Sequence, residues 1–125
     1  MAKYALVVMS ETGEANPAGQ ARMLHALKAA KELKAGGHDV RLWFHGVGVI
    51  WLSTFAARND PFGRHYGSLF DELRDDIGGA CEFCAVQRFG AADGAKRLGV
   101  EVVGGPEEHH TVAPLLAEGY QVVTF

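Results

Sequence analysis

The sequence has neither a strong net charge nor a long apolar run, the features typical of nucleic-acid-binding and membrane proteins. A formal net charge of -3 at pH 7 gives no electrostatic signature for binding nucleic acid or an anionic membrane surface. The apolar run at the N-terminus, residues 4–9, is too short for a signal peptide or a membrane span. We therefore expect a cytoplasmic protein with neither of these partners.

Cysteine is equally scarce, and both copies fall in one place. The two cysteines, Cys81 and Cys84, have C-x-x-C spacing. In a cytoplasmic protein such a pair favours redox chemistry, sulfur handling or metal binding over a structural disulfide. No second C-x-x-C pair is present. A zinc site would need two more ligands besides the two thiols. His109 and His110 could supply them only if the fold brings these histidines close to the cysteines. We predict no metal site.

The 125 residues, 48% of them hydrophobic, fit a single domain over residues 1–125. Apolar segments alternate with segments of helical spacing, which predicts an α/β fold. Strands are expected over residues 4–9, 39–45 and 100–103, at the cysteine corner and over 120–125. Helices are expected from Asn16-Pro17 to Gly36, over 66–77, after the cysteines to about residue 98, and over 110–116. The pattern predicts a three-layer α/β/α sandwich with a five-stranded parallel sheet.

The cysteine corner is the strongest candidate for chemistry. A glycine pair, Gly78-Gly79, precedes it and an alanine-rich segment that we expect to be helical follows it. The start of a helix favours a thiolate through its free N–H groups and its dipole. We expect Cys81, at the strand end, to be the more exposed and nucleophilic thiol, and Cys84 to turn partly toward the sheet. The alternative is that both are small buried hydrophobes.

Polar residues follow several of the predicted strands, and the carboxyl ends of parallel strands share one edge of the sheet. We therefore predict a ligand pocket at that edge, formed by Glu11, Thr12, Asn16, His45 and His110. The loop after the first strand is similar to the phosphate loop of flavodoxins. However, Ala15 stands where a hydroxyl is expected, and the carboxylates of Glu11 and Glu14 would repel a phosphate. We predict no flavin and no other cofactor.

The apolar segment Val47–Phe55 suggests self-association. It holds more apolar side chains than a short connection in a small domain can easily bury. An exposed apolar patch of that size marks an interface, so we expect a homo-oligomer.

The chain resembles the DsrE/DsrF-like family of small sulfur-relay proteins along nearly its whole length. The resemblance rests on the order and spacing of several short segments: Asn16-Pro17, Gly37–Val40, Gly46–Val49, Cys81-x-x-Cys84-x-x-x-Arg88 and Glu118–Val122. It implies a flavodoxin-like sheet with helices on both faces, assembled as trimers or hexamers. In the relay members a cysteine at this strand end carries a persulfide and passes sulfur to a partner protein, and Cys81 matches it by position.

Together these features predict an intracellular sulfur carrier or sulfurtransferase. Its persulfide would form on Cys81, Cys84 would resolve it, and its partners would be sulfur donor and acceptor proteins. The alternative is a non-catalytic oligomer that binds a small ligand or a metal in the same strand-end pocket.

Overall fold

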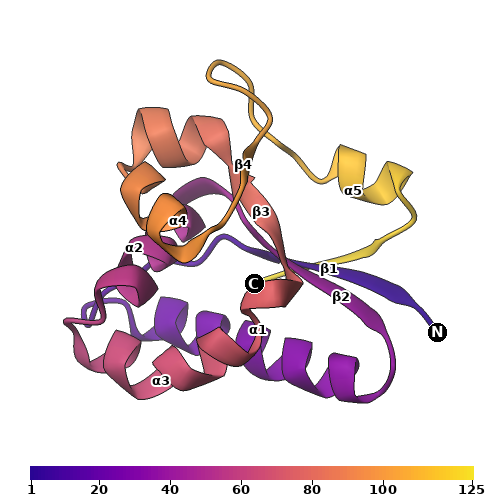
Figure 1. The fold of residues 1–125 in the computed structure, drawn as a ribbon, viewed down its shortest axis with the longest axis horizontal. Helices are drawn as coiled ribbons and strands as arrows, with labels where there is room; N and C mark the ends of the chain where they lie inside the picture. Colours follow the sequence, from indigo (N-terminus) through magenta and orange to yellow (C-terminus); the bar gives the residue numbers. More distant parts are fainter.

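The structure is a computed structural model that describes residues 1–125, and it contains one sheet of five parallel strands (Figure 1). The strands lie side by side in the order β4-β3-β2-β1-β5. They are β1 (Lys3–Val8), β2 (Asp39–Phe44), β3 (Ile77–Cys81), β4 (Val102–Val103) and β5 (Gln121–Thr124). The α-helices are α1 (Pro17–Ala35), α2 (Ile50–Ala57), α3 (Pro61–Glu72), α4 (Ala92–Leu98) and α5 (Ala113–Ala117). The predicted α/β class and five-stranded parallel sheet are confirmed.

Three short helical segments complete the fold. Two are 3-10 turns, η1 (Gly46–Val49) and η2 (Arg74–Asp76), and the third is a π-helix, η3 (Phe83–Arg88). We predicted an α-helix directly after the cysteines, and this was wrong. The segment Phe83–Arg88 is a π-helix, and the α-helix begins only at Ala92. A π-helix of this length is rare in proteins, and such segments often occur at functional sites.

The strand order explains why the two faces of the sheet are covered unequally. From β1 to β4 the chain steps across the sheet in one direction, and right-handed crossovers then place α1 to α4 on the same face. The chain returns to the other side of β1 for β5, so α5 covers the opposite face (Figure 1). Alternating side chains of β1 show the division: Leu6 and Val8 belong to one core, Ala5 and Val7 to the other.

The face under α1 to α4 holds the main core, a cluster of 23 buried residues. Its centre is aromatic: the rings of Phe55 and Phe70 stack at 4.3 Å, and Phe62 packs on Trp51 at 4.8 Å. Val49, Trp51, Leu52 and Phe55 are fully buried here. The sequence had suggested that this segment is an exposed interface, and that was wrong, because α2 packs inside the chain. A homo-oligomer therefore stays a prediction that has lost this support.

The opposite face has a much smaller core. Its fully buried members are Ala5 and Val7 of β1 and Leu115 of α5. Partly buried side chains surround them: Trp43, Val112, Tyr120 and Val122. Since α5 has five residues, this layer depends on few contacts.

Gly78 lies inside β3, not before it, and the strand begins at Ile77, which we had assigned to the preceding helix. The β2–β3 register shifts between Leu42 and Trp43. A Cβ on Gly78 would lie 2.4 Å from Cε2 of Trp43. Glycine is therefore required at this position, because the side chain of any other residue would overlap the indole of Trp43.

The connection from β4 to α5, residues 104–112, contains no helix or strand. It forms the loop at the top of Figure 1. Gly104 begins it with a φ of +105°, a conformation that other residues rarely adopt, and a Cβ there would lie 3.0 Å from the backbone nitrogen of His110. The turn thus directs the following histidines back toward the sheet.

Candidate functional site: a thiol–histidine cavity

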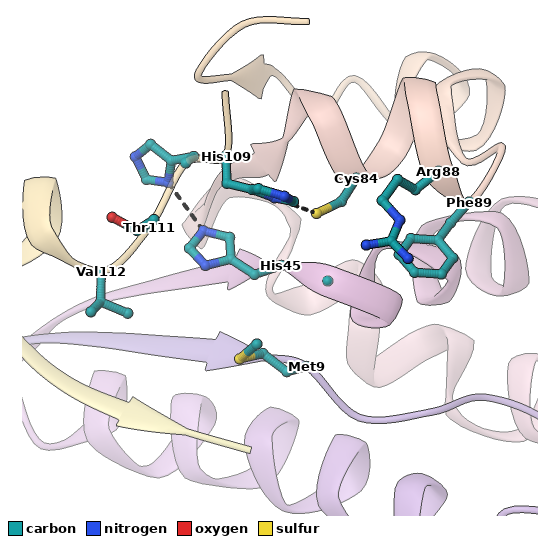
Figure 2. Close-up of a pocket in the computed structure, with 10 residues that line it drawn as sticks. Met9, His45, Cys84, Arg88, Phe89, His109, Thr111 and Val112 are labelled. Carbon is teal, nitrogen blue, oxygen red and sulfur yellow. Dashed lines mark hydrogen bonds between the residues drawn. The ribbon is translucent and has the colours of Figure 1, made fainter. Parts of the chain in front are cut away.

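A cavity of about 350 Å³ lies at the carboxyl edge of the sheet. It is lined by residues that follow β1, β2 and β3 and by the connection from β4 to α5, as the strand-end rule predicts. Figure 2 shows Cys84, His45 and Met9 around the same hollow, with Arg88 and Phe89 on one side of Cys84 and His109 on the other. The lining residues are Met9, His45, Gly46, Cys84, Arg88, Phe89, His109, His110, Thr111 and Val112.

The two thiols differ in their access to this cavity. Cys81 is the last residue of β3 and is completely buried, whereas Cys84, in the first turn of η3, is 2% exposed and lines the cavity. The Sγ of Cys81 accepts a hydrogen bond from the backbone N–H of His110 at 3.4 Å. The expectation that Cys81 is the more exposed thiol was therefore wrong. The loop carrying His110 closes over it, and Cys84 turns toward the cavity instead of the sheet.

His109 brings its ring to both sulfurs. Its Nδ1 lies 3.3 Å from Cys84 Sγ and 3.7 Å from Cys81 Sγ. The ring also packs edge-on against Phe83, with centroids 4.5 Å apart. This imidazole can accept a proton from either thiol, because it lies beside both sulfurs.

Two further histidines form another side of the cavity. His45 Nε2 lies 3.0 Å from His110 Nδ1, and the His110 ring stacks on Trp43 at 4.7 Å. Burial, with the neighbouring His110 and His109, lowers the pKa of His45 to about 4, and burial also lowers the pKa of His110. Both rings are therefore neutral at pH 7, one donating and the other accepting a proton in their hydrogen bond. They cannot stabilise a thiolate as cations.

The surroundings of Cys84 also disfavour a free thiolate. Burial and the hydrogen bond with Cys81 raise the pKa of Cys84 to about 11, and the opposing influences of the Gly46 amide and Arg88 are smaller. The prediction of a thiolate favoured by a helix start is wrong for this residue, because desolvation outweighs the backbone amides. Cys84 is a protonated thiol at neutral pH until another group takes its proton.

The other residues predicted to form the pocket are not brought to this cavity. Glu11 and Asn16 line a separate surface hollow beside the start of α1. Asn16 Nδ2 donates to the carbonyl of Thr12 at 2.7 Å, so this side chain ties its own loop together and does not cap the helix. The structure therefore separates Glu11, Thr12 and Asn16 from His45 and His110.

Sequence reasoning left several lining residues out of the predicted pocket. Met9 directly follows β1 and could have been found by the same strand-end rule. Arg88 was visible in the cysteine motif, and His109 stands next to a predicted pocket residue. Thr111 and Val112 carried no signal, because they were expected to belong to a helix.

The comparisons with known proteins identify the family of the chain. The model of the DsrE/DsrF-like family matches residues 3–125, and the chain belongs to this family. A segment of 63 residues is 35% identical to an uncharacterized protein of Methanocaldococcus jannaschii, covering 50% of this chain and 48% of that relative. The chain thus spans about half the length of this curated relative. No solved structure matches the chain significantly.

The lengths and hydrophobicity of the helices bear on whether the chain can span a membrane. None is both long enough and apolar enough to cross a bilayer.

Membership of the family supports a role of the sulfur-relay type.

Proposed function

We propose that the protein is a sulfur carrier or sulfurtransferase that holds sulfane sulfur on its C-x-x-C pair, with Cys84 as the accepting thiol. The observation that carries the proposal is the placement of the Cys84 sulfur in the cavity, 3.3 Å from a histidine nitrogen. The sequence pointed to Cys81, but that residue is completely buried and, unlike Cys84, does not line the cavity. We therefore assign the accepting role to Cys84, because its side chain has access to the cavity.

The chemistry begins with a proton transfer. His109 Nδ1 takes the proton of the Cys84 thiol, which makes up for the raised pKa of Cys84 at the moment of reaction. The resulting thiolate attacks the terminal sulfur of a donor persulfide. The S–S bond of the donor breaks, a new S–S bond forms on Cys84, and the donor leaves as a thiol with the proton held by His109. No oxidant or reductant is needed.

Two further residues suit this step. Arg88 is the one lining side chain with a permanent positive charge, and it can stabilise the anionic persulfide. Cys81 stands behind Cys84 as a second thiol. Its attack on the inner sulfur would expel sulfide and leave a Cys81–Cys84 disulfide. In the transfer direction, an acceptor thiolate instead removes the outer sulfur and restores the Cys84 thiol.

Sulfur loading of single-cysteine variants tests the proposal. The reduced protein, Cys81→Ser and Cys84→Ser are incubated with inorganic polysulfide, desalted and weighed by intact mass spectrometry. We expect one added sulfur on the unaltered protein, none on Cys84→Ser, and a longer-lived added sulfur on Cys81→Ser, which lacks the second thiol. Near-ultraviolet circular dichroism checks that each variant is folded.

Loading that survives in Cys84→Ser and is lost in Cys81→Ser would return the accepting role to Cys81. If neither the unaltered protein nor Cys81→Ser takes up sulfur, the proposal as a whole is overturned.

A further inference from the structure

The geometry points to a zinc(II) site formed by Cys81, Cys84 and His109, with a fourth coordination position open to the cavity. The two Sγ atoms and one imidazole nitrogen all lie within 4.8 Å of one another. Thiolates and imidazole are the ligands that zinc prefers in proteins. The inference goes beyond sulfur transfer, because it assigns a second ligand to the same group of side chains.

The distances fit a tetrahedral ion. With Zn–S bonds of about 2.3 Å and Zn–N bonds of about 2.0–2.1 Å, tetrahedral angles place a sulfur and a nitrogen ligand roughly 3.5–3.6 Å apart. His109 Nδ1 lies 3.3 Å from one sulfur and 3.7 Å from the other. His109 Nδ1 therefore lies within a few tenths of an ångström of the separation that the ion requires from each sulfur.

The charge of the site also suits zinc. Two thiolates and a neutral imidazole balance the two positive charges of the ion, and the two thiol protons leave to solvent on binding. Because both cysteines are buried, an uncompensated charge at the site would cost free energy, and a neutral complex avoids that cost. The backbone N–H of His110, 3.4 Å from Cys81 Sγ, is in place to donate to the bound thiolate.

No fourth protein side chain is grouped with these three ligands, so we expect the fourth coordination position of the zinc to be open. His45 and His110 hydrogen-bond to each other, and neither belongs to the group of ligand atoms around the two sulfurs. Cys84 and His109 both line the cavity, which leaves its volume of about 350 Å³ for water or a small ligand on the metal. Three protein ligands with one open position are the arrangement of zinc sites that bind or activate a substrate.

Cobalt(II) substitution tests the site. The reduced full-length protein is titrated with Co²⁺ under argon, and the visible spectrum is followed. We expect the intense absorption bands of tetrahedral, thiolate-bound cobalt, saturating at one ion per chain and disappearing when Zn²⁺ is added. A chromophoric chelator competing for Zn²⁺ then gives the affinity.

His109→Ala is the decisive variant, because the His109 side chain is exposed and its loss should leave the fold intact. We expect it to weaken Zn²⁺ binding by about tenfold or more. His25→Ala is the matched control, since His25 is an exposed residue of α1 that does not line the cavity, and it should bind as the unaltered protein does. Absence of the tetrahedral spectrum, or equal Zn²⁺ affinity in His109→Ala and His25→Ala, would overturn the metal site.

The metal and sulfur proposals can fail separately. Both use the thiols, so zinc-loaded protein should take up no sulfur from polysulfide until a chelator removes the ion. A protein that loads sulfur but gives no tetrahedral cobalt spectrum contradicts only the metal site. A protein that binds zinc but never gains sulfur contradicts only the sulfur carrier.

Discussion

The two faces of the sheet differ in how they are held and in what they supply. Helices α1 to α4 cover one face over a core of 23 buried residues, whereas α5 covers the other over three. The first face fixes β2, β3 and η3, and with them His45 and Cys84. The second is spanned by the connection after β4, which contributes His109 and His110. The site thus joins a firmly packed half to a lightly packed half, and regions with few buried contacts open more readily.

The largest expected effect is the loss of packing in the main core. Phe55→Ala removes a ring that stacks on Phe70 at 4.3 Å and is fully buried, so we expect a loss of about 3–5 kcal/mol in the free energy of unfolding. Leu115→Ala, its counterpart on the thin face, should cost about 2 kcal/mol, near the low end for such changes, since the surroundings of α5 can collapse more easily. Urea denaturation measures both, and equal losses would contradict the division into a strong and a weak face.

The next effect is a dependence of stability on pH through His45. Its ring is 5% exposed, and its pKa lies near 4 in the folded protein against an ordinary value of 6.5. Between these values the unfolded chain binds a proton that the folded protein does not. Stability is therefore full above pH 6.5 and falls as the pH is lowered toward 4, by up to about 3 kcal/mol.

The check is urea denaturation at pH 7 and at pH 4.5, for the unaltered protein and for His45→Gln. The variant should lose less stability between the two pH values, because it has no imidazole to protonate. His25→Gln, on the surface of α1, is the control and should behave as the unaltered protein does. A His45→Gln variant with an unchanged pH dependence would show that another group controls the loss.

The smallest expected effect is on the rate at which Cys84, at the junction of the two halves, is alkylated. A pKa near 11 instead of 9.0 leaves about a hundredfold less thiolate at neutral pH. Alkylation by iodoacetamide, followed by peptide mass spectrometry, should be slow at pH 7 and rise about tenfold per pH unit toward pH 10. Labelling in urea gives the reference rate. Fast labelling of Cys84 at pH 7 would mean that the connection opens often or that the thiol is already ionised.

The parallel sheet could be predicted from the sequence because its strands are short apolar runs bounded by glycine, proline and polar residues. The cysteine corner could be predicted because Cys81 and Cys84 stand together in sequence. In both cases the information is local, within one strand or one turn.

The wrong predictions about the two thiols depend on contacts between distant segments. His109 reaches Cys84 across 25 residues, through a connection without periodic pattern, so its proximity had no local signal. The burial of Cys81 depends on the same connection. The apolar segment at Trp51 was misassigned to an interface because hydrophobicity alone does not distinguish a buried helix from an exposed one. Asn16 was misplaced because its side chain satisfies a nearby carbonyl instead of facing the strand-end cavity.

The central claim is that the connection after β4 shields Cys81 and leaves Cys84 as the thiol that meets the substrate. Peptide mapping by tandem mass spectrometry tests it most directly. The unaltered protein is exposed briefly to polysulfide, its thiols and persulfides are trapped by alkylation, and the extra sulfur is assigned to one of the two cysteines. Our account predicts that the sulfur is found on Cys84 at early times. Sulfur found first on Cys81, or on neither cysteine, would contradict it.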